Sequence, residues 1–232
     1  MSRVAILADI HGNAPAMEAV LGAARAAAVE RLLIAGDFVG YYYAAGRVFE
    51  LLADWSWTAV RGNHENMLGD WIADRNRDDI HRRYGSGLQA ACEDVSVDQL
   101  DMLCALPPVR TVEVAGRQIV LCHGTPDCTD TYVYPDADED RWSAFFSGDA
   151  HLTIYGHTHY PVVQRRGPAR TVNPGSVGQP RDRTPGACWA LWDTQTDTVE
   201  LCRETYDPTA LIAECRRRDP DLSYLADVLT RT

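Results

Sequence analysis

Five short clusters of Asp, Asn and His residues are the part of this sequence best suited to chemistry. They offer carboxylate, amide and imidazole donors without a thiolate, a set typical of a catalytic Mn, Fe, Zn or Ni site rather than a closed structural zinc site. The donors are Asp9, His11, Asp37, Asn63, His123, His157 and His159, with His64 as a further imidazole. This number exceeds the need of one open catalytic metal and suits two ions that share a bridging carboxylate.

The first three clusters each follow a predicted strand. Apolar runs predict buried strands at 3–8, 31–35 and 57–60, and helical spacing predicts helices at 14–29 and 44–54 between them. Such strand–helix alternation indicates a parallel α/β sheet. Because ligands collect outside the carboxyl ends of parallel strands, we expect these clusters to meet at one edge.

The later clusters follow strands in the second half of the chain. His123 follows a predicted hairpin with a turn at Ala115-Gly116. His157 and His159 stand two residues apart, and in an extended segment both side chains would point the same way. The second-half strands are predicted at 109–114, 117–122, 152–155, 162–164, 169–172, 187–192 and 198–203.

Residues 65–106 are predicted to be mostly helical and residues 124–138 to form a polar loop, and no linker or repeat divides the chain. We therefore predict one domain over 1–232, with a helical cap-like segment near 65–106. A short helix is expected near 139–147 and C-terminal helices near 208–230, at 208–217 and 221–230. Ser96 and Gln99 form a capping-box pattern within the cap-like segment.

The amino-acid composition limits which partners the protein is expected to bind and in which cellular compartment it is expected to work. The net charge of -11 disfavours a stable complex with nucleic acid. The chain has no Lys, which excludes Schiff-base and Walker-type lysine mechanisms. Its cysteines lack a C-x-x-C spacing and indicate a reducing compartment. With no long apolar run for a membrane helix and no signal-peptide pattern, we expect a cytoplasmic protein.

Taken in order, the five motifs resemble those of the calcineurin-like metallophosphoesterase superfamily. Its small bacterial and archaeal single-domain phosphodiesterases are similar at three segments, 9–13, 36–41 and 173–181. The resemblance implies an α/β fold, a four-layer α/β/β/α sandwich with two packed mixed β-sheets. It also implies two divalent metal ions, Mn before Fe, Zn or Ni, and a metal-bridging hydroxide as nucleophile.

The resemblance further implies a role for each motif residue. One metal would take Asp9, His11, Asp37 and His159, and the other Asp37, Asn63, His123 and His157, so that Asp37 bridges. His64 would be catalytic rather than a ligand, contacting the phosphate and the leaving group. Near neutral pH an imidazole can supply that group with a proton or a positive partner.

Three residues flank these motifs and could bind substrate: Asn13, Arg61 and Arg181. Asn13 could equally cap the helix that follows it. Tyr41, Tyr42, Tyr132 and Tyr134 could stack on a nucleobase or could simply pack. The arginines at 75–83 could bind a polyphosphate tail, although a solvated helix face is the simpler interpretation.

The expected function is hydrolysis of a small nucleotide-like phosphodiester. The same site could serve a phosphomonoesterase, a dinucleoside-polyphosphate hydrolase or a protein phosphatase. A non-catalytic scaffold is a remote alternative, because every ligand position and His64 are present. A small phosphate ester is the expected partner, without a membrane, and a homo-oligomer is possible.

Overall fold

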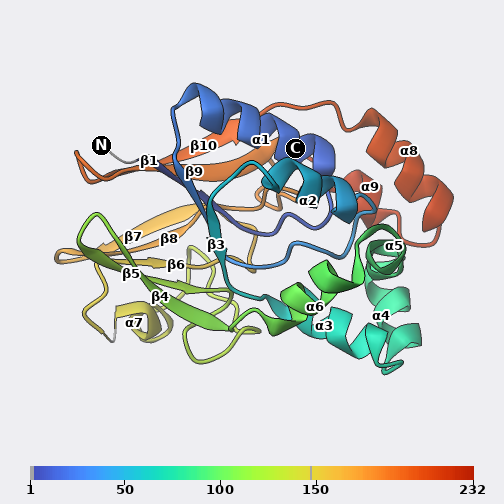
Figure 1. Ribbon diagram of the computed structural model, residues 1–232, viewed down its shortest axis with the longest axis horizontal. Coiled ribbons are helices and arrows are strands. Elements are labelled where there is room, and N and C mark those ends of the chain that lie inside the picture. The colour runs from blue at the N-terminus through green and yellow to red at the C-terminus, as the bar shows by residue number, and fades with distance from the viewer. Residues whose placement is uncertain (1–2, 147) are drawn as a thin grey trace.

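Two five-stranded mixed sheets face each other in the computed structural model, which describes residues 3–146 and 148–232 (Figure 1). The first sheet has the order β10-β9-β1-β2-β3, and the second has β4-β5-β6-β8-β7. The strands are β1 (Arg3–Leu7), β2 (Arg31–Ile34), β3 (Trp57–Ala59), β4 (Val109–Val114), β5 (Arg117–Cys122), β6 (Leu152–Ile154), β7 (Val162–Arg166), β8 (Ala169–Asn173), β9 (Ala187–Asp193) and β10 (Thr198–Glu204). Both sheets pair strands in parallel and antiparallel fashion, as the mixed-sheet prediction requires.

The alternation of side chains along β1 explains the layering. Val4 and Ile6 pack between the two sheets, where they meet residues such as Ile119 of the second sheet. Ala5 and Leu7 point the other way, into the core beneath the helices. Both faces of the strand are therefore buried, which is why its sequence is a continuous apolar run rather than an alternating one.

Helices cover the outer faces and complete the four predicted layers. Figure 1 shows α1 and α2 over the first sheet and α7 under the second. The helices are α1 (Ala14–Ala26), α2 (Ala45–Leu52), α3 (Asn63–Ile72), α4 (Arg77–Tyr84), α5 (Gly87–Asp94), α6 (Val97–Ala105), α7 (Glu139–Ser143), α8 (Thr209–Arg218) and α9 (Tyr224–Asp227), with a short 3-10 helix at Ala144–Phe146. Within the described residues, no helix is long and apolar enough to cross a membrane.

Most predicted elements are confirmed, with differences at several helix ends. The helix predicted at 14–29 ends at Ala26, and the one predicted at 221–230 is confined to Tyr224–Asp227. The helical segment predicted from residue 65 begins at Asn63, because Glu65 completes a capping box with the Gly62 backbone. Residues 1, 2 and 147 of the predicted domain and of the predicted helix 139–147 lie outside the described residues.

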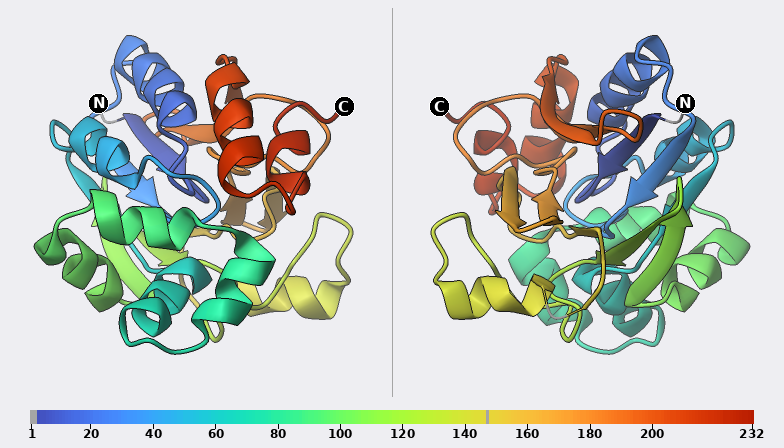
Figure 2. Two further views of the ribbon diagram at one scale, coloured as in Figure 1. Left: turned by 90° about the vertical axis from the view of Figure 1, so that its right-hand side faces the viewer. Right: turned by 90° about the vertical axis from the view of Figure 1, so that its left-hand side faces the viewer.

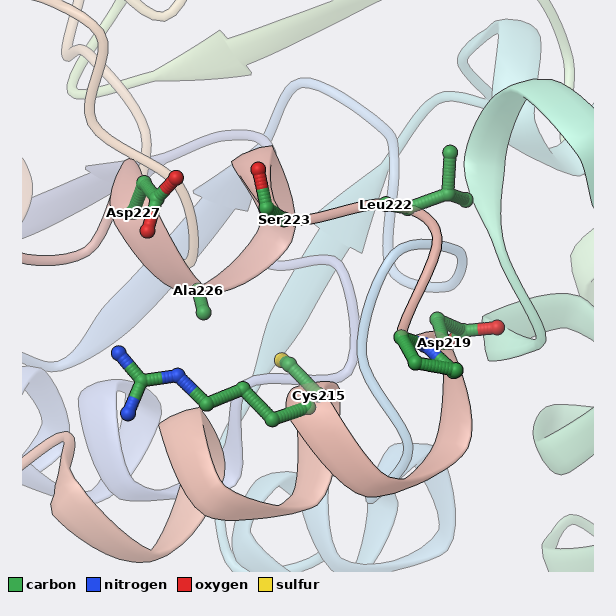
Figure 3. Close-up of a pocket in the computed structure, with 8 residues that line it drawn as sticks. Cys215, Asp219, Leu222, Ser223, Ala226 and Asp227 are labelled. Atoms are coloured by element: carbon green, nitrogen blue, oxygen red, sulfur yellow. The ribbon is translucent and has the colours of Figure 1, made fainter.

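The C-terminal helices are attached through the loop after β2. Tyr42 and Tyr43 are buried among α8 and α9; the Tyr42 hydroxyl donates to the Leu225 carbonyl and the Tyr43 hydroxyl to Asp219. Figure 3 shows a pocket of about 110 Å³ between these helices, lined by Cys215 and Asp219 among others. Figure 2 shows that α8 and α9 lie on the same side of the molecule as α3 to α6.

Candidate metal centre

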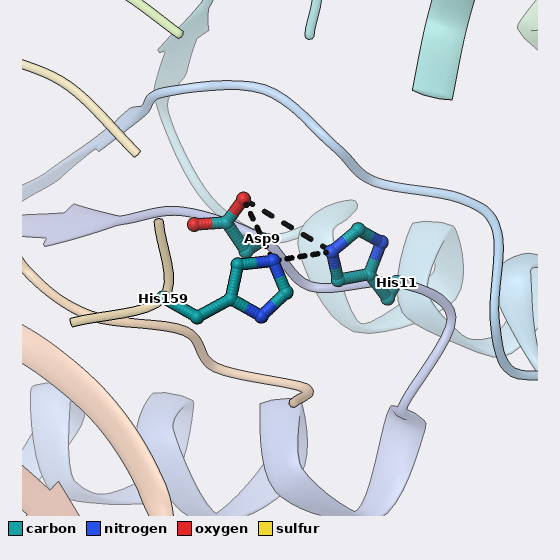
Figure 4. A group of neighbouring side chains, drawn as sticks. All are labelled: Asp9, His11 and His159. Atoms are coloured by element: carbon teal, nitrogen blue, oxygen red, sulfur yellow. Dashed lines mark hydrogen bonds and ion pairs between the residues drawn. The ribbon is translucent and has the colours of Figure 1, made fainter. Parts of the chain in front are cut away.

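The predicted donors converge on one buried cluster at the ends of strands from both sheets. Asp9, His11 and His159 form its first group, in which each residue offers one ligand atom and the atoms lie within 4.8 Å of one another (Figure 4). The Nε2 atoms of His11 and His159 are 3.2 Å apart, and His159 Nε2 is 3.6 Å from Asp9 Oδ1. All three side chains are buried.

The second group contains Asp37, His123 and His157 and satisfies the same 4.8 Å criterion. His123 Nε2 lies 3.2 Å from Asp37 Oδ2 and 3.0 Å from Asn63 Oδ1. The same Asp37 oxygen is 3.7 Å from His11 Nε2, so it stands between the two groups. A carboxylate in this position can contact an ion on either side.

Backbone carbonyls fix the orientation of the imidazoles. Nδ1 of His11 lies 3.2 Å from the Val39 oxygen, and Nδ1 of His159 lies 2.6 Å from the Gln179 oxygen. A carbonyl only accepts, so each Nδ1 carries the proton, and in a neutral ring each Nε2 presents a lone pair. Burial holds the pKa of both rings well below its usual range and keeps them neutral. Their facing Nε2 lone pairs therefore need a cation, and the donor set fits a divalent metal.

Five of the donors sit on left-handed backbone, which non-glycine residues adopt only at a cost. The φ angles are 55° at Asp9, 52° at His11, 56° at Asp37, 67° at His157 and 62° at His159. Strain of this kind persists where the surrounding structure enforces it and is concentrated at functional sites. The extended segment expected at His157 and His159 is therefore wrong: β6 ends at Ile154, and the two rings enter different groups of the cluster.

Glycine at position 62 permits the close packing around Asp37. A Cβ atom built on Gly62 would lie 2.1 Å from Asp37 Oδ1 and 2.9 Å from His123 Cε1. The next residues begin α3, and the His64 N–H donates to Asp37 Oδ1 at 2.9 Å. The Asp37 carboxylate is thus held by a helix N-terminus, which favours negative charge.

Glu65 is a positioning residue whose role the sequence motifs did not reveal. Its carboxylate accepts hydrogen bonds from the backbone N–H groups of Asp37, Phe38 and Gly62 at 2.7 to 2.9 Å. It is buried and joins the loop after β2 to the start of α3. Its place three residues after Gly62 in a capping box was the available signal.

Residues of the segment 173–181 form hydrogen bonds that hold the cluster in place. Ser176 donates its hydroxyl to the Asp9 carbonyl at 2.7 Å, and Asn173 donates to the Gly156 carbonyl at 2.7 Å. The Gln179 carbonyl receives His159 Nδ1. This segment therefore fixes the backbone on which two donors are carried.

The charges of Asp9, Asp37 and His123 shift one another's pKa values. The pKa of Asp37 is held well below its usual range by His123 and His64, although burial opposes this. The pKa of His123 is raised to about 10, because Asp37 outweighs the effect of burial. Burial raises the pKa of Asp9 to about 7. Protons thus supply, in the metal-free cluster, part of the positive charge that metal ions would bring.

His64 lies at the edge of the cluster against an aromatic wall. Its ring centroid is 4.6 Å from that of His11, 4.7 Å from Tyr41 and 5.3 Å from Tyr84. Burial lowers its pKa to about 4, so the ring is neutral near pH 7 rather than a ready cation. Its Nδ1 and His157 Nε2 are buried and lack a hydrogen-bond partner in the described structure. His64 also groups with His11 and Asp37 within ligand distance.

The three residues predicted to contact substrate, Asn13, Arg61 and Arg181, differ in where their side chains lie. Asn13 caps α1 by accepting from the Ala16 N–H, and its amide donates to the Gly178 carbonyl and to Tyr206, so it is occupied by the fold. Arg61 extends towards the Cys104 carbonyl near the end of α6, away from the donors.

Arg181 is the one of the three that borders the cluster. Its Nη2 donates to the Tyr41 hydroxyl at 2.9 Å, and its Nε and Nη2 donate to Gln179. After burial, its charge is the largest influence lowering the pKa of His159. Arg181 is therefore available to an anion that reaches the metal centre.

Of the tyrosines considered for stacking on a nucleobase, Tyr42 packs in the core instead, because it is buried against α9. Tyr41 borders His64 and Arg181, and Tyr132 lies over His157 with ring centroids 3.9 Å apart. Tyr132 stacks on Tyr134 at 5.7 Å, and both are partly exposed. The arginines at 75–83 are paired with Asp70, Asp74 and Asp79 on the surface, in agreement with a solvated helix face.

Comparison with known proteins identifies the family. Residues 2–197 match the model of the calcineurin-like phosphoesterase superfamily domain. An uncharacterised protein of Methanocaldococcus jannaschii is 28% identical over 89% of this chain and 88% of its own length. Phosphodiesterase YfcE of Escherichia coli is 28% identical over 86% of this chain and 91% of its own length.

Among solved structures, a metallophosphoesterase from Sphaerobacter thermophilus has the same fold. It superposes with a TM-score of 0.79 at 24% identity and covers 99% of this chain and 98% of its own. The family is metal-dependent, in agreement with the His and Asp groups described above. The chain belongs to the calcineurin-like phosphoesterase superfamily.

Proposed function

We propose that this protein is a binuclear metal-dependent phosphodiesterase that hydrolyses a small nucleotide-like ester. The observation that carries the proposal is the pair of neutral imidazoles of His11 and His159, whose Nε2 atoms face each other at 3.2 Å beside Asp9. A second buried group around Asp37 and His123 adjoins them. Two adjacent oxygen-and-nitrogen groups are the arrangement that a two-metal hydrolase needs.

The proposed ligand sets follow the two groups. Asp9, His11, Asp37 and His159 would hold one ion, and Asp37, Asn63, His123 and His157 the other. When bound, two divalent cations lower the pKa of water towards neutrality and offset negative charge on phosphoryl oxygens. Mn²⁺ is the proposed first choice, since hard oxygen donors are mixed with imidazole.

Residues of the chain would position the ester beside the ions. Arg181, held by Tyr41 and Gln179, can donate to a non-bridging phosphate oxygen. The buried ring of His64 can bind at the leaving-group side, since it lies within ligand distance of His11 and Asp37 at the edge of the cluster. Tyr41, Tyr84 and Tyr132 exclude water from the same edge and offer rings to a flat substituent.

A diester is preferred as the substrate class for two reasons. The relative YfcE is named a phosphodiesterase and aligns over most of both chains. The aromatic wall beside His64 suits an organic substituent on the phosphate better than a free phosphate dianion.

The test compares a diester with a monoester on the metal-reconstituted protein. After reconstitution with Mn²⁺, we expect close to two ions per chain and faster turnover of bis-p-nitrophenyl phosphate than of p-nitrophenyl phosphate. His123→Ala should lose metal and activity, and His151→Ala, outside the cluster, should keep both. Faster turnover of the monoester would favour a phosphomonoesterase, and a chain that takes up no metal would favour the scaffold.

A further inference from the structure

A pocket of about 450 Å³ opens beside the metal centre at the C-terminal end of the chain. Its lining is Gln179, Arg181, Tyr224, Asp227, Val228 and Arg231. The last four of these residues lie beyond residue 197, where the family match ends. Most of the pocket lining therefore comes from α9 and the residues after it, outside the matched family domain.

Two arginines line this pocket, and Arg231 Nη2 donates to the backbone carbonyl of Arg181 at 3.1 Å. A carboxylate, Asp227, also lines the pocket and partly offsets their charge. Two guanidinium groups against one carboxylate leave the lining with a net positive charge, which an anion with several oxygens can satisfy.

Arg181 connects the pocket to the metal centre. Its side chain donates to Tyr41, whose ring is 4.7 Å from that of His64, and Tyr41 also contacts Tyr224 at 6.4 Å. Tyr224 is 39% exposed, so its ring is available to a ligand. A molecule whose scissile phosphate lies at the metals can thus extend past Arg181 into the pocket.

The geometry points to a subsite for a second phosphate group of the substrate, bound by Arg231 beyond Arg181, while a flat ring lies against Tyr224. This inference rests on the proposed phosphodiesterase function and narrows its substrate class. The substrate would be a nucleotide diester that carries an additional phosphate remote from the scissile bond. Asp227 would tune affinity downward, since a carboxylate beside the bound phosphate repels it.

The experiment uses two chromogenic diesters that differ only in the second phosphate. They are thymidine 5′-(p-nitrophenyl phosphate) and its 3′-phosphorylated form, and both report by releasing p-nitrophenol. The full-length Mn²⁺-loaded protein should turn over the 3′-phosphorylated ester with a KM lower by about 10-fold, the scale of one charge-assisted contact. Arg231→Ala should remove most of this preference, and Arg231→Lys should restore part of it.

Asp227→Asn should have the opposite effect to Arg231→Ala. Removing a negative charge beside the bound phosphate should increase the preference for the 3′-phosphorylated ester. Arg217→Ala, on α8, is the matched control that removes an exposed arginine elsewhere in the C-terminal helices and should leave the preference unchanged. Equal KM values for the two esters in the wild type, or a preference that survives Arg231→Ala, would overturn the subsite.

A binding arm separates this result from failure of the proposed function. Calorimetric titration of the metal-free protein with thymidine 3′,5′-bisphosphate should give an affinity that Arg231→Ala weakens by about 10-fold. If bis-p-nitrophenyl phosphate is not hydrolysed but this binding holds, the catalytic proposal fails and the subsite stands. If turnover is normal and Arg231→Ala leaves bisphosphate affinity unchanged, the subsite fails alone.

Discussion

The carboxylate of Glu65 accepts a hydrogen bond from the backbone N–H of Asp37, with 2.9 Å between Oε2 and the nitrogen. Two further N–H groups, from Phe38 and Gly62, donate to the same carboxylate. One buried side chain thus fixes the loop that carries Asp37 against the helix that carries Asn63 and His64. The metal centre depends on a residue that is not one of its donors.

Replacing Glu65 with Ala should therefore destabilise the protein and disorder the centre together. Loss of the acceptor leaves buried N–H groups unpaired at about 1–3 kcal/mol each, so we expect a free energy of unfolding lower by about 3 kcal/mol or more. Urea unfolding and metal analysis measure the two effects. Glu93→Ala, at an exposed position of α5, is the control and should change stability by less than about 0.5 kcal/mol. Full metal content in Glu65→Ala would contradict a positioning role.

Gly62→Ala should displace the Asp37 carboxylate and slow turnover by about 100-fold. The added methyl would stand 2.1 Å from Asp37 Oδ1, so the carboxylate must move. Displacement of a reacting group by about 1 Å costs on the order of 100-fold in rate. Gly22→Ala, which meets nothing within 4 Å on α1, is the matched control and should be neutral or stabilising. Unimpaired turnover of Gly62→Ala would show that Asp37 is not confined in this way.

His64→Ala should separate catalysis from metal binding. If the ring acts on the leaving group, kcat should fall by about 100-fold or more, the usual scale for a positioned acid or base. The metal content should stay near that of the wild type. His81→Ala, on the exposed face of α4, should change neither quantity. Loss of one ion in His64→Ala would instead make His64 a ligand, a role that its distance from His11 and Asp37 permits.

Metal binding should release protons and strengthen as the pH rises. His123, with a pKa raised to about 10, carries a proton at pH 7, and Asp9, with a pKa raised to about 7, is partly protonated there. Both must lose that proton to bind a metal, so acid competes with the ion. Calorimetry at pH 7 in buffers of different ionisation enthalpy should detect about one to two protons released per chain. Identical heats in all buffers would refute this account.

Asp197 should make a pH-dependent contribution to stability far from the centre. It sits in the turn between β9 and β10, within hydrogen-bond distance of His151, Arg170 and Trp192. Burial alone would raise its pKa, but these partners hold the pKa of Asp197 well below its usual range. For a lowered carboxyl pKa, the stabilisation is fully present above the unfolded value near 4 and is lost as the pH falls through the folded value.

Asp197→Asn should accordingly lower the free energy of unfolding by about 2–4 kcal/mol at pH 7, because it leaves the buried Arg170 without its charge partner. The difference from the wild type should shrink below pH 3. Urea unfolding of the metal-free protein at both pH values measures this. Asp74→Asn, which breaks an exposed pair with Arg77, should cost less than about 1 kcal/mol at either pH.

Much of the fold was predictable because its elements are locally encoded. The apolar runs of β1 and β2 gave their positions, and the turn at Ala115-Gly116 gave the β4–β5 hairpin; both turn residues have the positive φ that such a turn requires. The helix predicted at 221–230 is shorter than expected, because the apolar residues of this segment pack on Tyr42 and Tyr43 without forming a regular helix throughout. Its packing depends on a loop far away in the sequence.

The candidate donors could be named from the sequence because residue type and the strand before each motif are local properties. Their chemistry, carboxylate, amide and imidazole, is fixed by the covalent structure alone. The sequence could not show that Asn13 is consumed by a helix cap, that Arg61 turns away, or that His157 and His159 enter different groups through left-handed backbone. The contacts that decide these outcomes include some between separate elements, since Arg61 reaches the Cys104 carbonyl and the Asn13 amide donates to the Gly178 carbonyl.

The sequence by itself thus determined the family, the order of the strands along the chain and the donor types of the centre. Only the tertiary structure decided which donors share a group, which lone pairs face each other and how Arg231 reaches Arg181 beside the candidate metal centre. The physical reason is that each of these relationships joins side chains from elements that meet only when both sheets pack. Distances between such groups are a property of the folded core and not of any local segment.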